Sequence, residues 1–103
     1  MTFPSHVRVS LALCTLIQGL ALEVVDIASI PKPKSGQLSR ELFFLAGAMR
    51  IRIEDQKNDW SRPEAIARRI VHDIRSDPGL SGAFSIAHHL ELFANDLLSE
   101  LTS

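Results

Sequence analysis

The sequence predicts an all-α protein, a single-domain bundle of about four helices with a long apolar N-terminal helix. Apolar residues recur at steps of three and four in separate segments, which is the period of an amphipathic helix. Prolines, glycines and an Asn58-Asp59 pair separate these segments. The chain has 103 residues, which is the size of one domain.

The composition is that of an ordinary folded protein. Hydrophobic residues make up 46% of the chain and charged residues 22%, which excludes an unfolded tail. The net charge of −1 argues against broad binding to polyanions. Cys14 is the single cysteine and cannot form an internal disulfide, so we expect a cytoplasmic protein in a reducing compartment.

The stretch from Val7 to Ile30 is the most apolar part of the chain, which is a property of membrane and export signals. Its longest run without a charge, from Val9 to Leu22, has about 14 residues, fewer than the ~20 that a spanning helix needs. The stretch also has the periodicity of a folded helix, which a discarded signal does not need. We therefore expect no membrane segment and no export signal.

The first helix is expected over residues 6–29. Its apolar residues form one broad face, which predicts the side that packs into the core. That face consists of Val9, Leu13, Leu16, Leu20, Val24 and Ile27.

A second seam on the same helix contains small residues at heptad spacing, which allows another helix to approach closely. It consists of Ser10, Cys14, Ile17, Ala21, Val24 and Ala28. Because the helix has more apolar residues than a bundle helix needs, the seam is expected to mediate self-association into a homodimer. The alternative is that this helix is central to the four-helix core of one chain.

Residues 30–36 are expected to be an extended connector, because Pro31 and Pro33 each lack a backbone N–H and disfavour helix at the preceding residue. The second helix is expected over 37–57. Its core stripe is Leu38, Leu42, Leu45, Met49 and Ile53. Residues 49–54 also alternate like a strand, but the longer pattern favours a helix.

The third helix is expected over 62–76, since Ser61 and Glu64 fit a capping box and Pro63 is permitted in the first turn. Its buried stripe is Ile66, Ala67, Ile70, Val71 and Ile74. The break at residues 77–79 leads to a fourth helix over 82–101. Its stripe is Ile86, Leu90, Phe93, Leu97 and Leu101.

No residue pattern indicates an enzyme. His88, His89 and Glu91 lie within one turn but lack the three or four convergent ligands of a metal site, so no metal and no cofactor are expected. Nothing near Cys14 in the sequence would activate it as a nucleophile. There is no nucleophile elbow and no glycine-rich phosphate loop.

A small helix-turn-helix protein that binds DNA is the alternative function. The helix over 62–76 carries the arginines for such a contact, namely Arg62, Arg68, Arg69 and Arg75. Against it, residues 76–103 contain acidic residues and no lysine or arginine, an unfavourable field beside DNA. We therefore expect no nucleic-acid partner. A third possibility is a secretion-type chaperone or a structural subunit.

Three apolar residues are the expected anchors for a protein partner. Leu11 and Leu22 lie about three turns apart on the otherwise polar side of the first helix, where the core does not need them. Phe3 precedes this helix and extends the same patch.

In length and helical pattern the chain resembles the small all-helical antiactivators of LuxR-type regulators, such as the quorum-sensing LasR-specific antiactivator of Pseudomonas, and more loosely the conjugation antiactivator TraM. The resemblance covers the whole chain but has no residue motif, so no residue roles follow from it. It implies a homodimer that binds a LuxR-type transcriptional regulator and blocks its dimerisation or DNA binding. We therefore expect a stoichiometric antagonist that acts by protein–protein contact.

Overall fold

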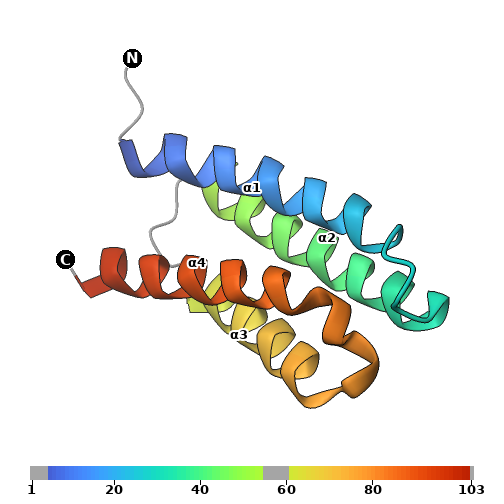
Figure 1. Ribbon diagram of the computed structural model, residues 1–103. Coiled ribbons are helices and arrows are strands. Elements are labelled where there is room, and N and C mark those ends of the chain that lie inside the picture. The colour runs from blue at the N-terminus through green and yellow to red at the C-terminus, as the bar shows by residue number, and fades with distance from the viewer. Residues whose placement is uncertain (1–4, 55–60, 103) are drawn as a thin grey trace.

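The computed structural model describes residues 5–54 and 61–102, and within these ranges the protein is all-α, as predicted. The elements in chain order are α1 (Ser5–Val24), α2 (Lys32–Glu54), α3 (Ser61–Ser76), the 3₁₀ helix η1 (Pro78–Ala83) and α4 (Phe84–Thr102). Figure 1 shows two helical hairpins, α1–α2 and α3–α4, packed against each other with both chain ends at the same end of the bundle. The described residues form no strand.

The core lies between the hairpins and uses the predicted stripes of α2, α3 and α4. The largest fully buried side chains of these stripes are Leu38, Leu42, Leu45, Met49, Ile70, Ile74 and Leu90. Ile53 and Ile66 are partly buried and pack against this cluster. Leu97 and Leu101 of the fourth stripe lie outside the part of the chain whose side chains are described.

The predicted core face of α1 is confirmed only in part. Val24 is buried, and Leu20 and Ile27 pack against the core, while the side chains of Val9 and Leu13 lie outside the described part. Cys14, Ile17 and Ala21 are buried against the rest of the chain, whereas Leu16, expected in the core, is 56% exposed. The reason is volume, because the small side chains let α2 approach α1 closely, and a leucine in their place would hold the helices apart. The seam expected to face a second copy therefore faces α2 of the same chain.

The expected long apolar N-terminal helix is not supported, because α1 ends at Val24 and not at residue 29. After it, Asp26 N–H donates to the carbonyl of Glu23 and Ile27 N–H to that of Val24, the tighter bonds of a turn. Pro31 disfavours helix at Ile30, which instead turns inward and is buried. Within the described residues, no helix is long and apolar enough to cross a membrane.

The expected extended connector over 30–36 is wrong, since α2 already begins at Lys32. Pro33 lies in the first turn, where a helix has no use for a backbone N–H. The carbonyl of Pro31 accepts the N–H groups of Lys34 and Ser35, both at 3.0 Å, and so starts the helix. The two prolines therefore flank a helix start instead of preventing one.

The turn between α1 and α2 and the 3₁₀ helix η1 lie at the same end of the bundle, opposite the chain termini (Figure 1). Gly82 of η1 approaches the turn after α1 so closely that an added Cβ would lie 2.4 Å from Ser29 Oγ. Lys34 Nζ donates to Asp77 Oδ1 at 2.8 Å, which links the start of α2 to η1. These contacts add to the shared core in holding the second hairpin against the first.

Ala21→Arg should unfold the monomer, because it would place a charge in the closest contact between α1 and α2, where Ala21 is fully buried. We expect the free energy of unfolding to fall by more than about 3 kcal/mol, measured by urea denaturation followed by circular dichroism. The matched control is Ala12→Arg on the exposed side of α1, which should change stability little. A folded, stable Ala21→Arg protein would contradict the packing of this hairpin.

Asp77 should make stability depend on pH. Hydrogen bonds from Lys34 Nζ and from the N–H of Gly79 lower the pKa of this carboxyl below its ordinary value. A group with a lowered pKa stabilises the folded state above its unfolded pKa, and this contribution is lost as the pH falls through the folded pKa. The wild type should be more stable than Asp77→Asn at about pH 7, and the difference should vanish between about pH 4 and pH 2.

Urea denaturation at a series of pH values measures this difference. Asp26→Asn is the control, because Asp26 is exposed and has no ion pair among the described residues. A constant difference between wild type and Asp77→Asn across the whole pH range would show that the charge of Asp77 does not contribute.

Candidate protein-binding surface

Among the side chains that the structure describes, the large exposed apolar ones are concentrated on the α1–α2 hairpin. Single exposed apolar residues are ordinary in folded proteins, whereas residues gathered on one surface mark an interaction site. On the hairpin and its turn they are Leu11, Leu16, Leu22, Val25, Phe43, Phe44 and Ile51, and on α4 they are Phe84 and Leu92. Within the described part of the second hairpin, fewer such side chains are exposed.

Two hydrogen bonds set the register of the hairpin. Cys14 Sγ donates to the carbonyl of Ala46 at 3.2 Å, and Ser39 Oγ donates to the carbonyl of Ala21 at 2.7 Å. The two bonded residues of α1 are seven positions apart, and so are the two bonded residues of α2. The helices therefore run antiparallel without a shift in register. In this register Phe43 lies level with the middle of α1.

Leu11, Leu22 and Phe43 form one line along the outside of the hairpin, called the hairpin face below. At about 100° per residue, Leu11 and Leu22 are turned away from the core side of α1 and toward the outer face of α2. The two leucines are 45% and 63% exposed and lie about 16 Å apart along the helix axis. Phe43 lies between them in axial position.

A shallow depression of about 370 Å³ opens next to the hairpin face, on the outside of α2. Gly47 forms its floor, and an added Cβ at this glycine would meet no atom within 4 Å. The depression is lined by Phe43, Phe44, Gly47, Ala48, Ile51, Arg52 and Arg62.

A second depression, of about 320 Å³, shares Phe44 with the first and continues between α2 and α3. Its lining residues are Gln37, Arg40, Glu41, Phe44, Ile66, Arg69 and Ile70. The two depressions lie one after the other along α2 with Phe44 between them, and we call them together the α2–α3 groove.

The arginines of the α2–α3 groove lack ion-pair partners among the described residues, whereas four of the basic residues outside the groove have one. Lys34 pairs with Asp77, Arg50 with Glu54, Arg68 with Glu64 and Arg75 with Glu91. The groove arginines that form no such pair are Arg40, Arg52, Arg62 and Arg69. The groove therefore has a positive rim in a chain whose net charge is −1.

Two of these arginines interact with the groove itself. The guanidinium of Arg62 lies 6.0 Å from the centre of the Phe44 ring, at the limit of a cation–π contact. Arg52 Nε is buried and has no hydrogen-bond partner within the described residues. A buried donor without a partner is costly, so it favours a ligand that brings an acceptor.

Glu41 is the one acidic residue in the lining of the groove. Burial raises the pKa of its carboxyl, and the nearby charge of Asp73 raises it further, while Arg69 opposes both effects. The carboxyl therefore offsets only part of the positive rim.

The structure places the predicted partner anchors in different ways. Leu11 and Leu22 are exposed on one side of α1, so both are free for contact, and their role as anchors stays a prediction. Phe3 lies outside the described residues.

The predicted self-association residues are mostly inside the chain. Cys14 is 6% exposed, and Ile17, Ala21 and Val24 are buried as well, so none of these four offers a surface to a second copy. Ala28 is exposed but lies in the turn beyond the end of α1. The side chain of Ser10 lies outside the described part.

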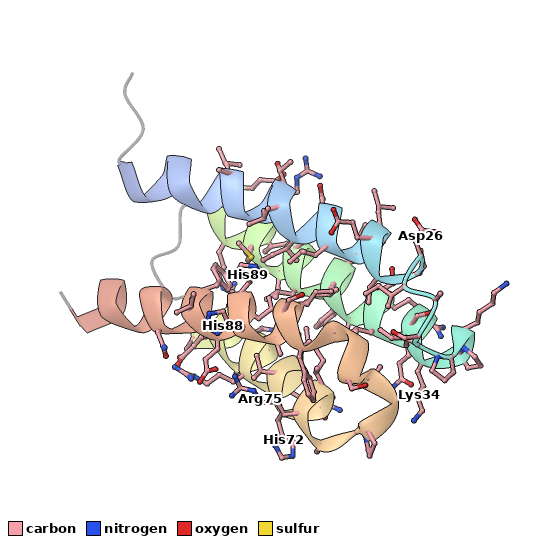
Figure 2. All side chains as sticks on the ribbon, in the orientation of Figure 1. Asp26, Lys34, His72, Arg75, His88 and His89 are labelled. Atoms are coloured by element: carbon pink, nitrogen blue, oxygen red, sulfur yellow. The ribbon has the colours of Figure 1, made fainter. Side chains whose placement is uncertain are left out.

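The histidines and the arginines of α3 are not arranged as expected for metal or DNA. Figure 2 shows His72 on α3, and His88 and His89 on α4, without convergence on one point. Within the described residues no three potential ligands lie together. Glu91 instead accepts a hydrogen bond from Arg75, which lowers the pKa of Glu91. Since Arg68 is also paired, half of the predicted DNA-contacting arginines are engaged within the chain.

Sequence reasoning missed Phe43, Phe44, Ile51 and Arg52 as members of a surface. One signal was present, because Ile51 lies off the core stripe of its helix and produces the strand-like alternation over 49–54. The groove itself needs α3 beside α2, which no local pattern specifies. Comparisons with protein families, with curated proteins and with solved structures find no match for this chain.

Cys14 should react slowly with thiol reagents in the folded protein. Burial raises the pKa of its thiol, with Arg50 opposing the effect, and only the thiolate is reactive. Labelling should accelerate strongly in denaturant. The matched control is Thr15→Cys in a Cys14→Ala background, which moves the thiol to the exposed neighbouring position and should label rapidly when folded. Equal labelling rates for the two positions would contradict the burial of Cys14.

Proposed function

We propose that this protein acts by protein–protein contact through the hairpin face, as a stoichiometric antagonist of a transcriptional regulator. The observation that carries the proposal is the concentration of exposed apolar side chains on the α1–α2 hairpin. A single folded chain gains nothing from leaving these side chains in water, whereas an interface buries them. Binding of this kind requires no catalytic group and no cofactor.

The hairpin face suits an antagonist because of its shape. Leu11, Phe43 and Leu22 present apolar anchors on two rigid helices, and a small number of such anchors supplies most of the affinity of an interface. A regulator that dimerises through helices exposes a similar apolar surface when it is monomeric. The hairpin would cover that surface and so block dimerisation or DNA binding. We also propose a cytoplasmic location, where a lone cysteine stays reduced.

The test begins with affinity purification from the source cell and quantitative mass spectrometry. Leu11→Ala combined with Leu22→Ala should weaken capture of the main partner about tenfold or more, since truncated anchors cost about 2 kcal/mol. The matched control is Leu16→Ala combined with Leu92→Ala, which removes exposed leucines that lie away from the hairpin face. Circular dichroism should show unchanged helix content for both variants.

The captured partner then decides the finer part of the proposal. A transcriptional regulator whose DNA binding is lost on equimolar addition of this protein supports an antagonist. Capture that survives the Leu11→Ala and Leu22→Ala changes would contradict the hairpin face. A main partner that is not a regulator would contradict the antagonist.

A further inference from the structure

We infer that the α2–α3 groove binds an amphipathic helix with an acidic flank, contributed by a partner protein. The inference deepens the proposed function and rests on it in one respect, namely that the ligand is a protein. The apolar side chains of such a helix would fill the hollow over Gly47, and its carboxylates would pair with the groove arginines.

The floor of the groove provides the apolar part of this recognition. Phe43 and Phe44 point to different sides of α2, since consecutive residues are about 100° apart, and Gly47 leaves the space between them open. Ile51 and Ala48 extend the apolar lining. A leucine or phenylalanine side chain of a partner fits a hollow of this kind, as in other helix-in-groove complexes.

The rim provides the charged part. Elsewhere in the described chain four basic residues each have an acidic partner, whereas the arginines of the groove have none. Arg40 and Arg52 are twelve positions apart on α2, which corresponds to about 18 Å. A helix of three to four turns spans this distance, so acidic residues at its two ends would reach both arginines.

An acidic helix fits these features better than a nucleic acid does. The rings of Phe43 and Phe44 would allow bases to stack, but the aliphatic lining at Ala48 and Ile51 matches leucine side chains better than it matches a sugar–phosphate backbone. The carboxyl of Glu41 in the lining would also repel a continuous phosphate backbone.

The groove is a poor binding site for η1 and the first half of α4 of a second copy. That region presents Phe84 and Leu92, but its described acidic residues are already engaged. Asp77 pairs with Lys34 and Glu91 with Arg75. If Asp77 or Glu91 of a second copy paired with a groove arginine, one existing ion pair would break for each new one that forms.

The test uses the full-length protein and two labelled model peptides of about 18 residues, or five helical turns. Both peptides carry the same leucine stripe, which is flanked by glutamates in one and by lysines in the other. Fluorescence anisotropy should show that the acidic peptide binds about tenfold or more tightly than the basic one. Its affinity should fall when the salt is raised to about 0.5 M.

Two groove variants locate the binding. Gly47→Leu adds a side chain whose Cβ meets no atom within 4 Å, so it should occupy the hollow and weaken binding of the acidic peptide about tenfold, as loss of a central pocket does. Arg52→Gln combined with Arg62→Gln should have an effect of similar size. The matched controls are Gly19→Leu, at an equally open helix position on α1, and Arg68→Gln, at an arginine that is already paired.

Four results would overturn the inference. The first is equal affinity of the protein for the two peptides, and the second is unchanged affinity of Gly47→Leu for the acidic peptide. The third is an oligonucleotide that binds through Arg52 and Arg62 more tightly than the acidic peptide does. The fourth is a wild-type dimer that the Gly47→Leu change dissociates. The partner captured from the cell distinguishes a failure of this inference from a failure of the proposed function. If that partner is lost with the Leu11→Ala and Leu22→Ala changes but kept by Gly47→Leu, the proposed function stands and the groove does not bind it.

Discussion

The close packing of α1 on α2 is the constraint on which the rest of the structure depends. Small residues on α1 allow the approach, and Ser39 Oγ and Cys14 Sγ each donate to a helix carbonyl of the other helix. A buried hydroxyl is costly unless it is hydrogen-bonded, so a slip of the hairpin would leave Ser39 without a partner. Packing and hydrogen bonding therefore select the same register.

This register also determines which apolar side chains of the hairpin remain exposed to solvent. Once the small side chains of α1 occupy the contact with α2, the larger ones must lie on the flanks, which is why Leu16 and Leu22 are exposed. On α2 the residues that face α1 and the core leave Phe43 and Phe44 on the outer side. The exposed apolar surface is thus a consequence of the tight hairpin and not a separate feature of the sequence.

The sequence predicted the helices with a single apolar stripe well, because only one side of α2, α3 or α4 can be buried. It could not rank the two stripes of α1, since both are apolar and the choice depends on how closely α2 approaches. Pro31 and Pro33 were misread because proline is compatible with a helix start as well as with a connector. Exposure of Leu11 and Leu22 could be expected from one helix, whereas the α2–α3 groove requires two helices whose relative position is set by the core.

The distribution of charge over the surface, like the groove, could not be predicted from the sequence. A net charge of −1 suggests a surface without a preference for acidic ligands. The ion pairs do not distribute this charge evenly, because Asp77, Glu64 and Glu91 pair with Lys34, Arg68 and Arg75. Among the described residues, no ion pair forms at the arginines beside Phe44. Local recognition therefore depends on which charges the fold has already paired, and this cannot be read from the sum.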